Sequence, residues 1–229
     1  MQTHELFDLT YPQKNIWITE EFFKGTSVNN ICASATIFEN MNEQLLKQAI
    51  NNVVKQNDSF RLHFILEGNS VKQYVSEYRS FKIETEYITN KKQLDKIEKE
   101  ESSYIFNVFD SDLFKFKIVF LKNTFTYIIL TVNHLISDSW SMGLTIQEIL
   151  KNYNNLYNKK ESDSKNPSYI DYINSEIKYK SSKRFENDKQ YWDKLFETIP
   201  EQATIPSSVK SFKDISYKAE RFSFEFVTE

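Results

Sequence analysis

The feature that most constrains the fold is an apolar, strand-like run followed closely by a histidine. Phe125–Val132 consists largely of β-branched and aromatic residues with few polar breaks. Such a run is typical of a strand buried on both faces in the middle of a sheet. A second run, Phe114–Leu121, precedes it after a short polar link. We therefore expect Phe125–Val132 to be an interior strand, with His134 standing just beyond its carboxyl end.

Helical and strand-like patterns alternate along the rest of the chain without a regular β-α-β rhythm. Period-two alternation marks a strand at Asn30–Phe38, and Asn42 begins a helix with apolar residues at helical spacing. The remaining expected elements are strands at Phe60–Glu67, Val71–Val75, Phe81–Tyr87 and Arg221–Val227, and helices capped by Thr10 or spanning Lys91–Phe106, Ser141–Tyr157, Ser168–Tyr179 and Arg184–Phe196. These patterns predict an α+β fold, with helices flanking a central mixed β-sheet.

Composition argues against several classes of partner. The net charge is −3, and proteins that bind nucleic acid usually carry a basic excess, so no nucleic acid is expected. Cys32 is the single cysteine, which rules out a disulfide within the chain and fits a reducing cytoplasm. No secretory signal and no run of about 18 apolar residues is visible, so we expect a cytoplasmic location and no membrane partner.

His134 is the side chain that most resembles a chemical centre. It lies on a strand-to-helix loop, where reactive groups commonly stand, and imidazole exchanges protons near neutrality. A structural alternative stays open, in which Asp138 or Ser139 caps a helix beginning near Ser141 and His134 is a hydrogen-bonded loop residue. A metal site would need ligands that no nearby His or Cys supplies. A Ser-His-Asp hydrolase would lack its Gly-x-Ser-x-Gly turn.

Several motifs, in a fixed order, carry a resemblance to a known family. Residues 132–141 resemble the His-His-x-x-x-Asp-Gly signature of nonribosomal peptide synthetase condensation domains and related acyltransferases. Residues 9–17 resemble the family's N-terminal motif, and residues 56–64 its Arg-His-Glu-x-Leu-Arg-Thr-x-Phe motif. Residues 169–172 and 191–195 resemble its Tyr-x-Asp-Phe/Tyr and Tyr-Trp segments. Each motif is loose alone, but their shared order is fairly specific.

The resemblance implies a fold and a division of the chain. Family domains have a chloramphenicol-acetyltransferase-like fold of two similar lobes, with the active site in a tunnel between them. They are roughly twice as long as this chain of 229 residues. Residues 1–200 would form the N-terminal lobe, and residues 201–229 a connector and first strand leading to a missing C-terminal lobe. The chain is therefore expected to be part of a longer protein.

The resemblance also implies roles for individual residues. His134 matches the second His of the signature, the catalytic one, whose Nε2 would orient the attacking amine and either accept its proton or stabilise the tetrahedral zwitterion. Asp138 would form an ion pair with Arg61 and support the site architecture, because a guanidinium matches a carboxylate with two hydrogen bonds. Asn133 and Ser139 stand where the family has its first His and its Gly. Both are therefore assigned to the site architecture.

The implied reaction is amide formation between an acyl or peptidyl thioester and an aminoacyl thioester. Phosphopantetheine arms of peptidyl carrier proteins would hold both substrates, and an adenylation domain would belong to the same assembly line. No cofactor or metal bound by this chain is expected, and the truncated chain is expected to be inactive. Asn133 and Ser139 motivate the alternative of an inactive module that recruits a carrier protein or tailoring enzyme. A single-lobe acyltransferase is disfavoured because its signature usually lies near the C-terminus.

Overall fold

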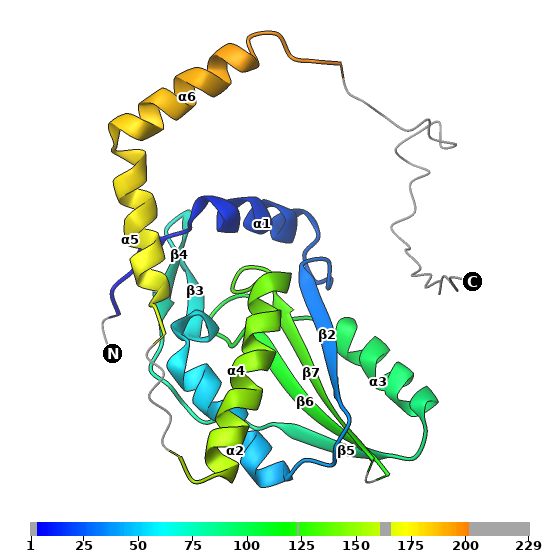
Figure 1. Cartoon of the computed structure of the whole chain (residues 1–229). Coiled ribbons are helices and arrows are strands. Elements are labelled where there is room, and N and C mark those ends of the chain that lie inside the picture. Colours follow the sequence, from blue (N-terminus) through cyan, green and yellow to red (C-terminus); the bar gives the residue numbers. More distant parts are fainter. Residues whose placement is uncertain (1–3, 123, 161–165, 202–229) are drawn as a thin grey trace, which may run out of the picture. The chain divides into compact units, whose positions relative to one another are not determined.

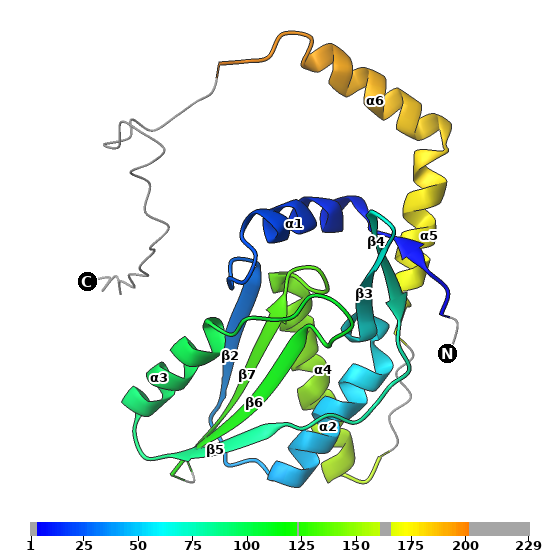
Figure 2. The same ribbon diagram turned by 180° about the vertical axis from the view of Figure 1, so that it is seen from behind.

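The computed structural model describes residues 4–122, 124–160 and 166–201, which belong to two compact units. The first unit extends to Lys180 and the second begins at Ser181. The first contains a three-stranded sheet in the order β1 (Phe7–Asp8), β4 (Ser70–Val75), β3 (Leu62–Glu67). It also contains a four-stranded sheet in the order β2 (Asn30–Ile37), β7 (Phe125–Asn133), β6 (Phe114–Leu121), β5 (Glu84–Ile88) (Figures 1 and 2). Helices pack on the larger sheet, in which β5 and β6 are parallel and the other neighbours antiparallel. The predicted α+β class with a mixed sheet is confirmed.

The elements follow the sequence patterns closely. The strands are β1 Phe7–Asp8, β2 Asn30–Ile37, β3 Leu62–Glu67, β4 Ser70–Val75, β5 Glu84–Ile88, β6 Phe114–Leu121 and β7 Phe125–Asn133. The helices are α1 Tyr11–Phe22, α2 Glu43–Gln56, α3 Lys91–Ser102, α4 Ser139–Tyr157, α5 Tyr169–Lys180 and, in the second unit, α6 Lys183–Leu195, with a 3₁₀ turn η1 at Asp58–Arg61. The expected strand Arg221–Val227 lies outside the described residues.

Most predicted bounds lie within two residues of those in the structure, and two elements differ by more. The strand expected at Phe81–Tyr87 begins at Glu84, because Phe81 precedes the sheet and packs edge-on against Phe114, with ring centroids 5.0 Å apart. The helix expected to reach Phe106 ends at Ser102. There the hydroxyls of Ser102 and Ser103 donate to the carbonyl of Lys99. Serine hydroxyls that take up backbone carbonyls compete with continuation of a helix.

Strand β7 is the interior strand that the sequence predicted. It pairs antiparallel with β2 on one side and with β6 on the other. Every residue after Phe125 is buried along its length. Its last residue is Asn133, so His134 stands at its carboxyl end, as expected. The centre of the sheet therefore fixes the position of the His134 backbone.

The two faces of β7 enter two different hydrophobic clusters. Ile128 and Leu130 belong to the main core, which also contains the buried apolar residues of α2 and α4. Tyr127 and Ile129 belong to a smaller cluster with Leu94 of α3. Figure 1 shows α2 and α4 together on one side of the sheet, and Figure 2 shows α3 on the other. Coverage on both faces explains why the strand carries almost no polar alternation.

Short polar side chains begin the helices that surround the sheet. Thr10 and Gln13 form a capping box at α1, in which the Thr10 backbone N–H donates to Gln13 Oε1 at 2.9 Å. Asn42 Oδ1 accepts the backbone N–H of Leu45 at 3.0 Å and caps α2. Such caps satisfy the free N–H groups of a first turn and each stabilises by about 0.5–2 kcal/mol. The predicted starts at Thr10 and Asn42 are confirmed.

A buried cluster of charges ties α3 to the sheet. Lys117 Nζ on β6 lies 2.7 Å from Glu101 and 2.8 Å from Glu86, and Lys115 Nζ lies 2.9 Å from Glu101. Burial alone would lower the pKa of Lys117, but the hydrogen bonds from Glu101 and Glu86 outweigh it and raise that pKa. Lys117 is therefore held in its charged form at neutral pH. The cluster places fixed polar contacts within an otherwise apolar layer.

The burial of β7 generates a test with a matched control. We expect Leu130→Ala to lower the free energy of unfolding by about 2–5 kcal/mol, because it opens a cavity around a fully buried side chain. Leu66 on β3 is 59% exposed, so Leu66→Ala should change stability by no more than about 0.5 kcal/mol. Urea denaturation followed by circular dichroism measures both. Equal losses in the two variants would contradict the assignment of β7 to the core.

Candidate active site

His134 is held on the turn that follows β7. Its backbone N–H donates to the carbonyl oxygen of Asn29 at 2.8 Å, next to the first residue of β2. Its Nδ1 lies 3.1 Å from the carbonyl oxygen of Ser137. Because a carbonyl oxygen only accepts hydrogen bonds, this contact requires the ring proton on Nδ1. In the neutral ring, Nε2 is then the nitrogen with a lone pair available to a substrate.

The half-buried His134 lines a cavity of about 520 Å³. The other lining residues come from the start of α1, the start of η1, the turn after β7, the start of α4 and the start of α5: Pro12, Gln13, Ile16, Asn57, Asp58, Ser59, Leu135, Ile136, Ser137, Asp138, Ser141, Pro167, Ser168, Tyr169 and Tyr172. Burial raises the pKa of Tyr169 to about 12, so its hydroxyl stays protonated near neutrality. A cavity of this size with a few directed polar groups suits a small-molecule substrate.

Asp138 is the N-cap of α4. Its Oδ1 accepts the backbone N–H of Ser141 at 2.7 Å. The hydrogen bonds from Ser141 lower the pKa of Asp138, and nearby His134 lowers it further. The helix cap that the structural alternative assigned to Asp138 is thus present. The helix begins at Ser139, two residues earlier than expected.

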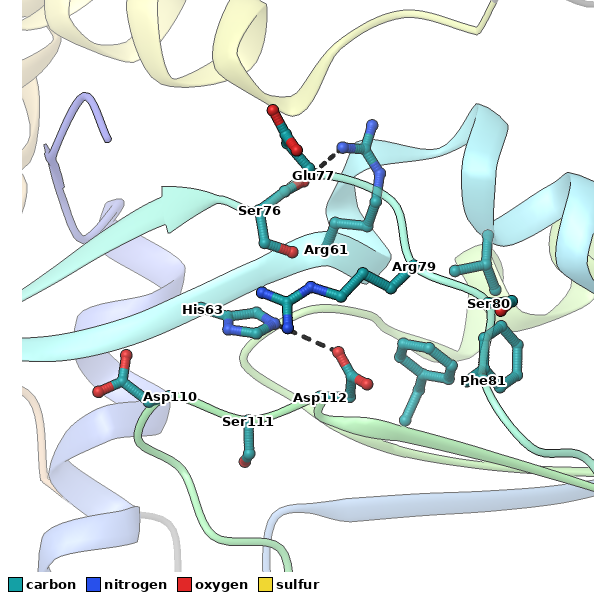
Figure 3. A pocket seen from close by; sticks show the side chains of 12 residues that line it. Arg61, His63, Ser76, Glu77, Arg79, Ser80, Phe81, Asp110, Ser111 and Asp112 are labelled. Carbon is teal, nitrogen blue, oxygen red and sulfur yellow. Dashed lines mark hydrogen bonds and ion pairs between the residues drawn. The ribbon is translucent and has the colours of Figure 1, made fainter. Parts of the chain in front are cut away.

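The expected ion pair between Arg61 and Asp138 is wrong, because no salt bridge joins these two described residues. Arg61 lines a separate cavity of about 380 Å³, whereas Asp138 lines the cavity of His134. Arg61 Nη1 donates to the carbonyl oxygen of Ser76 at 2.6 Å, just beyond β4 (Figure 3). The physical reason is that the backbone of α4 satisfies the Asp138 carboxylate, so it has no need of a guanidinium.

The cavity around Arg61 carries charges of both signs. Figure 3 shows Arg61, Arg79 and His63 grouped with Asp110 and Asp112. His63 Nε2 lies 3.2 Å from Asp112 Oδ1, so this histidine has a carboxylate partner away from the cavity of His134. Two guanidiniums beside carboxylates leave little net field for an anionic ligand. We therefore place the candidate chemistry at His134 and not in this second cavity.

The two departures from the family signature lie outside the space open to a substrate. Asn133 is buried, its Oδ1 accepts the backbone N–H of Leu135 at 3.0 Å, and its Nδ2 lies 3.4 Å from Glu20 Oε2. Ser139 is the exposed first residue of α4 and does not line the cavity of His134. Asn133 thus shapes the turn, and Ser139 adds no side chain to the cavity wall.

Sequence reasoning missed several residues that hold the turn. Gln13 Nε2 donates to the carbonyl oxygen of Leu135 at 3.0 Å. The amides of Gln13 and Gln73 also pair reciprocally, with both hydrogen bonds at 2.8 Å. Gln13 belongs to the quoted N-terminal motif, which was the available signal for it. Gln73 and Glu20 lie in ordinary strand and helix patterns that offered none.

Three of the quoted motifs meet at the same cavity. Asp58 Oδ1 accepts the backbone N–H of Tyr169 at 2.8 Å, and its other oxygen accepts the hydroxyl of Ser168. The hydroxyls of Tyr169 and Thr10 are also 3.3 Å apart, which joins the start of α5 to the cap of α1. Parts of the motif segments at residues 9–17, 56–64 and 169–172, with Asn57–Ser59 from the second of them, therefore build one wall of the cavity around His134.

Two properties of the described residues bear on the site. They contain no group of three or more His, Cys, Asp or Glu side chains arranged to hold a metal ion. Within the same ranges, none of the helices has both the length and the apolar character needed to cross a bilayer.

Comparison with known proteins gives one family and several relatives. The family model described as "Condensation domain" matches residues 4–229. Surfactin synthase subunit 1 of Bacillus subtilis is 33% identical over 225 residues, covering 95% of this chain and 6% of that protein. Bacitracin synthase 1 of Bacillus licheniformis is 24% identical over 177 residues, covering 74% of this chain and 3% of that protein.

Solved structures show the fold. The starter condensation domain of the rhizomide synthetase RzmA matches with a TM-score of 0.80 at 17% identity, over 86% of this chain and 49% of that chain. The first condensation domain of the calcium-dependent antibiotic synthetase, solved with a substrate analogue, matches with a TM-score of 0.79 at 15% identity, over 87% and 50%. The predicted chloramphenicol-acetyltransferase-like fold is confirmed, and the chain spans about half the length of these solved domains.

The separation of Arg61 from Asp138 can be tested by a double-mutant cycle. We expect Asp138→Ala to lower the free energy of unfolding by about 0.5–2 kcal/mol, because it removes the helix cap. Asp138→Asn keeps a capping oxygen and should lower the free energy of unfolding only slightly. Arg61→Ala and Asp138→Ala together should lower the free energy of unfolding additively, within about 0.3–0.5 kcal/mol. Chemical denaturation of the four proteins gives the coupling energy. A coupling well above that limit would mean that the two side chains interact after all.

Proposed function

This chain belongs to the condensation-domain family, and from that membership we propose that it forms the N-terminal lobe of a condensation domain in a nonribosomal peptide synthetase. The proposed reaction joins an acyl or peptidyl thioester to the amine of an aminoacyl thioester. The observation that carries the proposal is the geometry of His134. Its Nδ1 is engaged by the Ser137 carbonyl, which leaves Nε2 for a substrate amine in a cavity of about 520 Å³.

The residues support a specific course for the reaction. The substrate amine attacks the thioester carbonyl carbon, a C–N bond forms, and the C–S bond then breaks. Nε2 of His134 accepts a hydrogen bond from the amine, orients it, and takes its excess proton. That proton is then returned to the departing thiolate, which leaves as a thiol. General acid–base help of this kind contributes roughly 10²–10⁴ in rate.

Positioning of both thioesters would contribute further, and it requires a second lobe. We propose that residues 1–200 form the first lobe and that residues 201–229 lead to the second. Several large apolar side chains support this division: Ile18 and Phe22 on α1 are 54% and 80% exposed, and Trp140 and Leu144 on α4 are 78% and 48% exposed. Large apolar side chains exposed on both helices suit a surface that a second lobe covers.

The same proposal implies the partner proteins and the cellular location. Peptidyl carrier proteins would deliver both substrates on phosphopantetheine arms, and an adenylation domain in the same protein would load the acceptor. The cytoplasm, where such assembly lines find their substrates, is the proposed location. Asn133 and Ser139 give little support to the inactive recruitment module, because neither side chain intrudes on the cavity of His134.

The proposed chemistry predicts the effect of removing the imidazole. In the full-length protein that carries these residues, we expect His134→Ala to lower the rate of amide formation by about 10²–10⁴. His63→Ala is the matched control, because His63 lines the other cavity and should leave turnover near the wild-type rate. The measurement is dipeptide release from two loaded carrier proteins, followed by mass spectrometry. Equal rates for wild type and His134→Ala would contradict the proposed role.

The two-lobed arrangement predicts the behaviour of the isolated chain. We expect residues 1–229 alone to form no measurable amide from two loaded carrier proteins, because half of the substrate tunnel is missing. Extension by the second lobe should restore product. Full activity of the isolated chain would contradict the division into lobes. An extended protein that binds a carrier tightly yet stays inactive would favour the recruitment module.

A further inference from the structure

Glu20 takes no part in the chemistry above, yet its placement is unfavourable. The residue is only 8% exposed and lies in the last turn of α1, where the helix dipole disfavours a negative charge. No lysine, arginine or histidine of the described chain forms an ion pair with it. Burying a carboxylate without a cation costs free energy unless hydrogen bonds compensate. The role of the Glu20 carboxylate therefore follows from the groups that donate hydrogen bonds to it.

Two buried asparagine amides donate to one oxygen of Glu20. Asn29 Nδ2 lies 2.6 Å from Glu20 Oε2, and Asn133 Nδ2 lies 3.4 Å from the same atom. Asn29 Nδ2 is also 3.3 Å from the carbonyl oxygen of Ile16 within α1. A single carboxylate thus joins helix α1, the residue before β2, and the last residue of β7.

The same two asparagines hold the backbone on either side of the His134 side chain. The carbonyl oxygen of Asn29 accepts the N–H of His134 at 2.8 Å. Asn133 Oδ1 accepts the N–H of Leu135 at 3.0 Å. Consecutive peptide groups around His134 are therefore fixed by residues that Glu20 holds in place. Their orientation sets the direction of the imidazole and its contact with Ser137.

We propose that Glu20 is a positioning residue for His134, acting through Asn29 and Asn133. The inference rests on the proposed function, because it takes His134 as the residue that meets the substrate amine. The hydrogen-bond acceptor on Glu20 is what matters, since both asparagines approach one oxygen. A glutamine at this position keeps an acceptor and loses the charge, whereas a leucine loses both at similar size.

Nitrogen NMR of the histidine rings tests directly whether Glu20 positions His134. The chain has only His4, His63 and His134, so their signals are separable by single substitutions. In this chain of 229 residues we expect His134 to carry its proton on Nδ1, and Glu20→Gln to preserve that tautomer. Glu20→Leu should shift the ring toward protonation on Nε2. Glu21→Leu is the control, because Glu21 is exposed and pairs with Lys24 at 2.9 Å.

Turnover supplies the second measurement. In the protein extended by the second lobe, we expect Glu20→Leu to lower kcat by about 10–100-fold with KM little changed, as for a reacting group displaced by a fraction of an ångström to about 1 Å. Glu20→Gln should recover most of that loss. If Glu20→Leu does not fold, Asn133→Ala removes the same support from the Leu135 N–H and should give the same shift in tautomer and kcat.

The outcomes separate the inference from the function on which it rests. An unchanged His134 tautomer and unchanged kcat in Glu20→Leu, or in Asn133→Ala where that variant replaces it, would overturn the positioning role. A Glu20→Gln variant as impaired as Glu20→Leu would also overturn it, because the charge and not the acceptor would then matter. A wild-type protein that forms no amide, while its tautomer still responds to Glu20→Leu, would count against the proposed function alone.

Discussion

The burial of β7 on both faces is the constraint on which the rest of this structure depends. Because both faces are apolar, hydrophobic pattern alone sets the register of this strand only weakly. Buried polar contacts do the rest: the Thr126 hydroxyl donates to the carbonyl oxygen of Glu39 at 2.8 Å and accepts the N–H of Met41 at 3.0 Å. On the neighbouring strand, Lys117 is fixed by Glu86 and Glu101. These contacts determine which residue of the chain emerges at the sheet's end.

The turn that emerges there is held by side chains from several distant segments. Gln13 binds the carbonyl oxygen of Leu135, Asn133 binds its N–H, and the carbonyl of Asn29 binds the N–H of His134. Buried backbone groups must find partners, and side-chain networks that satisfy them are rigid. The motif segments are therefore spread along the chain because the turn needs support from more than one direction. That support leaves the imidazole half-exposed to the cavity without leaving its backbone free.

The sequence allowed strands β2 to β7, most helix starts and the position of His134 to be predicted, because local pattern and capping chemistry determine them. The Arg61–Asp138 pair was predicted from motif correspondence, which identifies residue types but not their rotamers or competing partners. The Asp138 carboxylate instead accepts a hydrogen bond from the backbone N–H of Ser141 at the start of its own helix. Glu20 and Gln73 could not be found from sequence, since each has a partner more than fifty residues away and no local spacing signals a buried network.

The ionisable groups around the cavity differ in what they can do near neutral pH. Hydrogen bonds from Ser141 hold the pKa of Asp138 below its ordinary value, so this carboxyl group stays ionised and does not carry protons. Burial raises the pKa of Tyr169 to about 12, so this phenol stays protonated. Imidazole is the side-chain type that exchanges protons between pH 5 and 8, and His134 brings it to this cavity. The surrounding groups thus supply fixed charge and fixed donors, while proton transfer falls to the histidine.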